Sequence, residues 1–334
     1  MPRRERVTQL LYLVLGSALG AALVLALDTG SSGAILFDGL RDWWGGRESA
    51  PAIILREIRL PRALSALAVG ATLGMAGAAL QGMLRNPLAE PGLVGASNCA
   101  ALGAVIVFYF GFAGLHPLLL PAAGIFGAIM ALLLLRVLVG DYARVATLIL
   151  AGVALNAFAG AAIALALNLA PSPYAMHEIV YWLMGSVANR SYAELAFSLP
   201  FMIVAAGLLL STRSYLEALS LGEDIAHSLG FGARSLPWRV MGGVAVGVGA
   251  AVAISGSIAF VGLVVPHLLR PFVANRPGQL LLPSALGGAL LVLMADILVQ
   301  SLPGDTELKL GVVTALLGAP FFLAIVIGSR SRIA

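Results

Sequence analysis

The sequence contains few of the side chains on which most soluble functions depend. Only 11% of its 334 residues are charged, and it has one cysteine, Cys99, and one lysine, Lys309. A single cysteine excludes a disulfide within the chain and any metal site built from several cysteines, so we interpret Cys99 as a small buried apolar residue. The lysine lies between Leu308 and Leu310, so the P-loop that binds ATP phosphates is absent.

Motifs for catalysis and for nucleic-acid binding are missing too. The sequence has no His–Glu metal signature and no nucleophile elbow. The formal net charge is +4, but the basic residues are scattered near the ends of apolar segments and form no patch. We therefore expect no bound metal, no cofactor on this chain, no catalytic site and no nucleic-acid partner.

Apolar residues make up 60% of the chain, far more than in a soluble protein. A helix needs about 20 apolar residues to cross a bilayer, and this length has room for about ten such helices. The 39 glycines would let the helices pack closely. We predict an all-α, polytopic membrane protein in contact with lipid, with a single transmembrane domain over residues 1–334. The expected spans are Leu10–Leu27, Pro61–Met83, Val94–Phe112, Pro117–Val139, Ala146–Leu169, Glu194–Leu210, Val240–Ala253, Ile258–Leu269, Leu280–Val299 and Leu310–Ile327.

The arginines indicate the orientation. Arg3, Arg4 and Arg6 precede the first span, and no convincing small-residue cleavage site follows, so we interpret this segment as a membrane helix with a cytoplasmic basic end. Alternating the spans from there leaves most arginines inside. Both termini are then cytoplasmic, whereas Asp28–Glu57 and Pro171–Ser191 lie outside.

A polar segment, Thr212–Arg239, separates two long apolar regions. Ser220 is a candidate helix cap, Glu223 and Asp224 fall in the first turn where the helix dipole favours acids, and Gly230 is a natural stop. A short helical turn can precede this helix. The pattern predicts a compact helical element on the cytoplasmic side.

The same element carries apolar side chains at regular spacing. Leu221, Ile225 and Leu229 recur every four residues and share one helix face. This pattern favours a surface that docks a soluble partner; a solvated loop between two spans is the simpler alternative.

Other irregular features fall near the expected spans. Residues 85–95 contain Pro87 and Pro91 and cannot form a continuous helix, so they predict either a cytoplasmic gate or an ordinary turn. Asp296 is either functional or bonded to a helix end. His267, beside Pro266, is expected to organise a broken helix rather than to bind metal.

Taken together, several fragments of the sequence resemble the FecCD family of bacterial ABC-importer permeases, which serve ferric siderophores, haem and vitamin B12. They occur in the family's order from about residue 50 to the end of the chain. The fragments are Ile58–Arg62, Gln81, Arg85–Gly92, Leu150–Leu155, Tyr181–Gly185, Leu221–Asp224, Leu229–Gly230, Ser255–Gly256, Phe260–His267, Gly311–Ala315 and Gly318–Pro320.

The resemblance implies a type II ABC importer permease fold with ten spans per subunit. It also implies a homodimer with the path along its interface, two separate ATPase subunits that hold ATP and Mg, and a periplasmic substrate-binding protein. The implied function is import of an iron chelate, a ferric siderophore or haem, across the bacterial inner membrane by alternating access. No bond in the substrate is altered.

The resemblance also assigns roles to residues. Arg59 and Arg62 match outer-face arginines that dock the binding protein in the family's B12 member, and Asn86 and Leu88 match its inner gate. The helices around Asn156, Asn86 and Pro266 would open to one side. The segment that would couple to the ATPase contains Leu221, Gly222, Glu223, Asp224, Ile225, His227, Leu229 and Gly230.

The sequence departs from that pattern at three places. A third outer-face arginine is Gln300 here, and the usual proline after Glu307–Leu308 is Lys309, which we hypothesise replaces the lost positive charge at the docking surface. A second gate position reads Val145–Ala146, without hydroxyls.

Two alternatives stay open. Within the class, Ala89–Gly95 favours a vitamin B12 (cobalamin) importer as much as a haem importer. Outside the class, an ion-coupled secondary transporter is the rival, although the paired acids expected of one are sparse. An intramembrane enzyme has little support.

Overall fold

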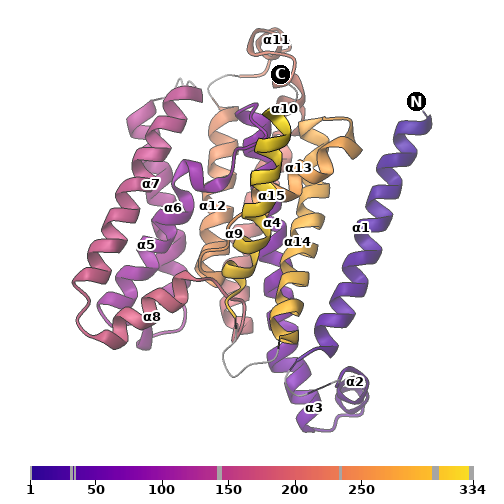
Figure 1. Cartoon of the computed structure of the whole chain (residues 1–334), viewed down its shortest axis with the longest axis vertical. Coiled ribbons are helices and arrows are strands. Elements are labelled where there is room, and N and C mark those ends of the chain that lie inside the picture. Colours follow the sequence, from indigo (N-terminus) through magenta and orange to yellow (C-terminus); the bar gives the residue numbers. More distant parts are fainter. Residues whose placement is uncertain are drawn as a thin grey trace.

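The computed structural model describes residues 2–30, 33, 35–140, 145–232, 235–302 and 308–330. Within these ranges the chain forms helices and no strands (Figure 1). The helices that coincide with the expected spans are α1 (Pro2–Asp28), α4 (Leu60–Met83), α5 (Ala96–Tyr109), α6 (Leu119–Val139), α7 (Val145–Asn168), α9 (Tyr192–Ser211), α12 (Leu236–Ser255), α13 (Val261–Leu269), α14 (Pro277–Ser301) and α15 (Leu310–Arg330).

Shorter elements connect these helices. They are α2 (Leu36–Trp44), α3 (Ala50–Ile53), a π-helical segment η1 (Ile54–Arg59), α8 (Pro173–Leu183), α10 (Arg213–Leu219), α11 (Glu223–Ser228) and the 3-10 turns η2 (Pro91–Val94), η3 (Phe112–Gly114) and η4 (Arg270–Val273). Among the described residues, seven helical stretches are long and apolar enough to span a membrane, and three shorter apolar helices complete the expected set. The predicted fold class is confirmed.

The segment Asp28–Glu57, expected to be a loop, is largely helical. Ser49 caps a helix that resumes at Ala50, because its hydroxyl accepts a hydrogen bond from the Ala52 N–H at 3.4 Å and Pro51 occupies the first turn. The chain then passes through α3 and η1 into α4, so Ala50–Met83 is one helical stretch of 34 residues.

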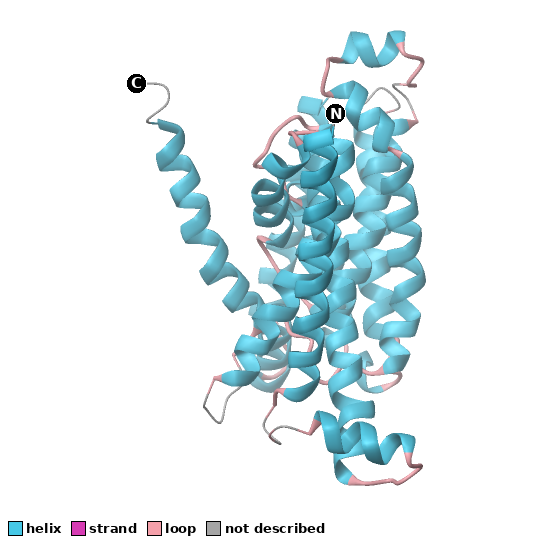
Figure 2. Ribbon diagram, turned by 90° about the vertical axis from the view of Figure 1, so that its right-hand side faces the viewer, coloured by secondary structure: helices cyan, strands magenta, loops and turns pink. Residues whose placement is uncertain are grey.

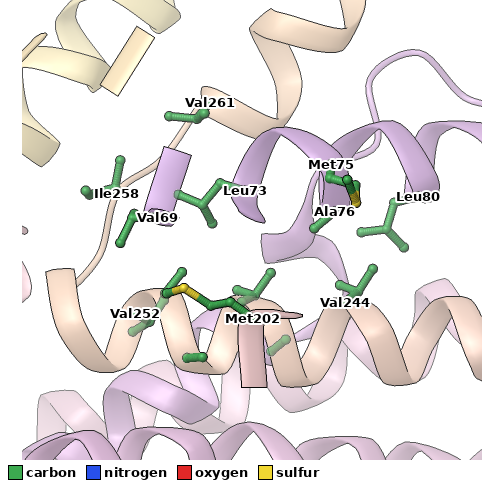
Figure 3. Packing of buried hydrophobic residues seen from close by; sticks show 14 of the residues in the cluster. Val69, Leu73, Met75, Ala76, Leu80, Met202, Val244, Val252, Ile258 and Val261 are labelled. Carbon is green, nitrogen blue, oxygen red and sulfur yellow. The ribbon is translucent and has the colours of Figure 1, made fainter. Parts of the chain in front are cut away.

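Helices α4 and α12 form the centre of the bundle. Most of their residues are buried, and α14, α9, α5, α6 and α13 pack around them. Figure 3 shows Leu73 and Leu80 of α4 across from Val244 and Val252 of α12, with Met202 of α9 beside them. Lipid supplies no hydrophobic driving force between helices, so close van der Waals contact of this kind holds the bundle together.

Glycine allows α4 to touch α13 backbone to backbone. A methyl group added to Gly77 would lie 2.4 Å from the Cα atom of Gly262. No side chain fits in that space, so the two helix axes approach as closely as the main chains permit.

The short connecting helices lie at the two ends of the bundle. The start of α1, the end of α15 and α10–α11 lie at one end of the bundle, and α2, α3 and α8 lie at the other (Figure 1). Helix α15 leans away from the other helices toward its C-terminal end (Figure 2).

We predict that Gly77→Ala lowers the stability of the folded chain by about 1–3 kcal/mol, because the added methyl group forces α4 and α13 apart. The measurement is thermal unfolding of the purified protein in detergent. The matched control is Gly207→Ala in α9, since a methyl group there meets no atom within 4 Å. Equal melting temperatures for the two variants would contradict this account of the packing.

Candidate functional site

Helices α10 and α11 form the polar element that the sequence predicted, with one correction. Ser220 does not cap α11, because its hydroxyl donates to the Glu217 carbonyl at 2.7 Å and closes α10 instead. Gly222 precedes α11 and provides no side-chain cap. The acids Glu223 and Asp224 occupy the first turn of α11, as expected.

The end of α11 follows the predicted stop. Gly230 has φ of 84° and donates to the His227 carbonyl at 2.9 Å, and the Phe231 N–H donates to the Ala226 carbonyl at 3.1 Å. This pair of bonds is a Schellman motif. The Phe231 ring then lies 6.2 Å from that of Tyr215, centroid to centroid, which holds α11 against α10.

The apolar side chains of this element face outward at the end of the molecule. Leu221, Ile225 and Leu229 are 64%, 45% and 60% exposed. They are interspersed with the exposed side chains of Glu223, Asp224 and His227, and α11 projects beyond the bundle (Figure 1). A patch of this composition, away from the long apolar spans, has the chemistry of a protein-docking surface.

Ion pairs between described residues connect α10–α11 to the bundle. Arg85 Nη2 lies 3.6 Å from Glu223 Oε1, and Arg276 Nε lies 3.6 Å from Glu217 Oε2. Glu217 also accepts from the Gln279 N–H at 3.2 Å. Exposed pairs contribute only about 0.2–1 kcal/mol, so the contacts orient the element more than they stabilise it.

The predicted gate residues lie in the loop after α4. Asn86 is exposed and Leu88 is half-buried, and the Asn86 side-chain oxygen accepts from the Leu88 N–H at 2.9 Å. The loop is therefore an ordered turn. Burial raises the pKa of the Glu90 carboxyl in the same loop, a residue that sequence reasoning did not single out.

This loop continues into η2, which packs between α7 and α13. A methyl group on Gly152 of α7 would lie 2.6 Å from the Leu93 carbonyl oxygen, and one on Gly262 of α13 would lie 3.0 Å from Pro91 Cδ. Asn156 lies one turn after Gly152 on α7. The structure thus brings the loop, the Asn156 helix and the Pro266 helix together.

The second predicted gate position, Val145–Ala146, lies at the start of α7. Val145 begins α7 and Ala146 beside it is exposed, while residues 141–144 lie outside the described residues. No described contact joins Ala146 to Asn86 or Leu88.

Pro266 interrupts the hydrogen bonding of α13. A proline has no N–H, so the Gly262 carbonyl four residues earlier lacks its helical donor. The side-chain amide of Gln81 in α4 donates to that carbonyl and to the Leu263 carbonyl, at 3.3 Å each. The sequence analysis named Gln81 only as part of the family resemblance and assigned it no role. The signal for a role was a polar residue in the apolar second half of α4.

Arg59 does not lie where a docking residue is expected. Its side chain is inside the protein, 4% exposed. Its guanidinium donates to the Leu27 carbonyl at 2.9 Å and to the Gly33 carbonyl at 2.7 Å, so it joins the end of α1 to the start of α4.

Arg62 is also committed within the molecule. Its guanidinium donates to both carboxylate oxygens of Asp296 in α14 at 2.9–3.1 Å, and the Gln300 amide donates to the same carboxylate at 2.8 Å. Asp296 thus bonds side chains that lie near helix ends, Arg62 in the first turn of α4 and Gln300 in the last turn of α14. Gln300, which stands where an arginine was expected, completes this cluster.

Lys309 lies beside α8, at the start of α15. Its ammonium is 3.7 Å from the ring centroid of Tyr181, a cation–π contact. The two residues line a cavity of about 310 Å³ that also contains His177, Glu178 and Arg190. Among the described residues, no group of three or more His, Cys, Asp or Glu side chains could hold a metal ion.

Comparisons with known proteins place these features in a family. The model of the FecCD transport family matches residues 13–328. The hemin transport system permease protein HmuU of Yersinia pestis is 37% identical over 327 residues, covering 96% of this chain and 97% of HmuU.

Other relatives cover somewhat less of the chain. The vitamin B12 import system permease protein BtuC of Vibrio cholerae is 44% identical over 270 residues, 80% of each chain. The Fe(3+) dicitrate transport system permease protein FecD of Escherichia coli is 37% identical over 295 residues, 87% of this chain and 90% of FecD.

A solved structure also superposes on the chain. It is an inward-facing conformation of an ABC transporter assigned to the metal-chelate type. The TM-score is 0.84 at 32% identity, covering 96% of this chain and 99% of that one.

We predict that Arg62→Met lowers the stability by about 3–5 kcal/mol, because the Asp296 carboxylate stays buried and loses its charged partner while the Gln300 amide remains. The double variant Arg62→Met/Asp296→Leu should recover most of this loss. Thermal unfolding of both variants in detergent gives the comparison. A double variant as unstable as the single one would contradict the pairing.

Proposed function

The chain belongs to the FecCD transport family, and from that premise we propose that it is the permease subunit of an ATP-driven ABC importer for an iron chelate. The cargo is a ferric siderophore or haem. The observation that carries the proposal is the α10–α11 element, whose exposed Leu221, Ile225 and Leu229 project from one end of an apolar bundle. An importer needs such a surface to receive force from a soluble motor.

The motor in this proposal is a pair of separate ATPase subunits that hold ATP and Mg. The permease itself has no P-loop, so its energy must come from outside the chain. The α10–α11 element docks into a groove of one ATPase subunit, with Leu221, Ile225 and Leu229 as apolar anchors. Glu223 and Asp224 contribute charge complementarity at the rim.

The proposal places two copies of the chain side by side, with the transport path along their interface. Support comes from α15, which leans away from the bundle and leaves Leu316, Leu317 and Leu323 exposed (Figure 2). An open apolar groove of about 600 Å³ lies between α15, the end of α8 and the segment that joins α12 to α13. A second copy or a cargo molecule would cover these surfaces.

A periplasmic binding protein delivers the cargo to the opposite end, where α2, α3 and α8 lie. Arg59 and Arg62 are held by partners within the chain, so we assign the docking charge to Lys309. This arrangement puts the permease in the bacterial inner membrane with both termini in the cytoplasm. The arginines before the first span favour that orientation.

Transport in this proposal proceeds by alternating access. ATP binding closes the two ATPase subunits and moves α10–α11 on each permease. The loop Asn86–Leu88, the α7 helix around Asn156 and the α13 helix around Pro266 then change their packing and open the path to one side. No covalent bond of the cargo changes.

Cobalamin is the second candidate cargo. The vitamin B12 permease of Vibrio cholerae has the higher identity, 44%, whereas the hemin permease of Yersinia pestis matches more of the chain, 96%. Both cargoes are large chelates of a tetrapyrrole-type ring, and an apolar path leaves no ligand signature that separates them.

The test is uptake into liposomes that contain this chain and its ATPase, with the binding protein added outside. Haemin, a ferric siderophore and cyanocobalamin are offered in turn. We expect one of the iron chelates to accumulate only when ATP is present inside. Accumulation of cyanocobalamin alone would replace the iron chelate as cargo. Uptake that persists without the ATPase and stops with an ionophore would overturn the proposal in favour of a secondary transporter.

A charge-reversal variant tests the docking role within the same assay. Glu223→Lys/Asp224→Lys should abolish cargo uptake or detach the ATPase, because both side chains are exposed on α11. The variant also breaks the exposed Glu223–Arg85 ion pair, which contributes only about 0.2–1 kcal/mol to the fold. Normal coupled uptake by this variant would contradict the docking role.

A further inference from the structure

We propose that the Gln81 side chain is a positioning group that ties the proline-interrupted helix α13 to α4 and, through the end of α4, to the α10–α11 element. Movement of α11 is thereby passed to α13. This inference rests on the proposed function, because it concerns how force from the ATPase reaches the transport path.

The need for such a group comes from Pro266. Within an apolar bundle, a carbonyl without a donor is costly, and water is not at hand to supply one. The Gly262 carbonyl loses its helical donor to Pro266 and takes the Gln81 amide instead, at 3.3 Å. The break in α13 is therefore satisfied by a different helix.

A second contact fixes which way the Gln81 amide points. Arg270 Nη2 donates to Gln81 Oε1 at 2.6 Å, which assigns the oxygen to that side and leaves Nε2 to face the α13 carbonyls. The Gln81 residue is 1% exposed. Its side chain thus binds both ends of α13, the first turn through Gly262 and the C-terminal end through Arg270.

The main chain of Gln81 forms the other half of the connection. Its carbonyl accepts from the Asn86 N–H at 3.2 Å, and the Arg85 N–H donates to the Gly82 carbonyl at 3.4 Å, so α4 ends in a Schellman motif. The predicted gate loop starts at the residue that this carbonyl holds.

Arg85 occupies the position in that motif where glycine is usual. Its φ is 48°, a left-handed conformation that disfavours a side chain. Its guanidinium contacts Glu223 of α11 at 3.6 Å. A continuous series of contacts therefore runs from α11 through Arg85 to Gln81 and on to α13.

The packing next to Gln81 leaves little room for α13 to move independently. Gly77 precedes Gln81 by four residues, so both lie on the same face of α4. There the Gly77 backbone meets Gly262 so closely that an added methyl group would lie 2.4 Å from the Gly262 Cα. Because the two backbones touch, a displacement of the C-terminal end of α4 also displaces α13.

The experiment combines two substitutions that have opposite effects on the Gly262 carbonyl. Gln81→Leu removes its donor, whereas Pro266→Ala restores the helical one. We expect Gln81→Leu to lower the Tm by a few degrees and Pro266→Ala to leave it unchanged or raise it. In the Pro266→Ala background the Tm loss from Gln81→Leu should be smaller. An equal Tm loss in the two backgrounds would overturn the Gln81–Gly262 tie.

The amount of cargo imported per ATP hydrolysed then distinguishes a positioning role of Gln81 from a role in stability alone. The cargo is whichever of haemin, ferric siderophore or cyanocobalamin the wild-type complex imports. We expect the double variant Gln81→Leu/Pro266→Ala to be folded, to hydrolyse ATP and to import roughly tenfold less cargo per ATP. Thr72→Val in α4 is the matched control, because its hydroxyl bonds only within its own helix, and it should import normally. A double variant with wild-type import per ATP would overturn the proposal.

Failure of the proposed function and failure of the Gln81–Gly262 hydrogen bond give different results. If the wild-type complex imports none of the three probes, the proposed function fails. The Tm comparison requires neither cargo nor ATPase and decides the Gln81–Gly262 tie in either case.

Discussion

The Gly262 carbonyl is the polar group on which the inner half of this structure depends. Along α4 and α12, whose prolines lie in the first turn, the backbone can satisfy itself within its own helix, and the helices need only close apolar contact. Pro266 inside α13 removes that self-sufficiency, and Gln81 restores the hydrogen bond from α4. The two helices become a unit because neither can be moved away without exposing an unpaired carbonyl.

Charged residues serve a related purpose at the other end of the bundle. Arg62 joins α4 to Asp296 of α14, and Arg59 joins the end of α1 to the start of α4 through backbone carbonyls. A long helix that is anchored by an ion pair at one end and by Gln81 at the other can act as a rigid rod. The α10–α11 element is by contrast attached through exposed ion pairs, which suits a part that must follow a partner.

The sequence predicted the helices far better than the contacts between them. Each expected span coincides with a helix, because apolar runs of this composition favour helices in a bilayer. The helix that resumes at Ala50 was missed because its polar residues read as a loop. Arg62 and Asp296 are 234 residues apart, and no local pattern reveals that they meet. Ser220 illustrates the same limit on a small scale, since either α10 or α11 could have used its hydroxyl.

Cysteine cross-linking can show whether the α10–α11 element is the surface that receives a separate ATPase. The single native cysteine, Cys99, can be replaced by alanine, after which Ile225→Cys and Phe37→Cys place one thiol at each end of the molecule. With a short thiol cross-linker in the assembled complex, we expect position 225 to join the ATPase and position 37 not to join it. Cross-linking of position 37 to the ATPase, with position 225 left free, would contradict this expectation.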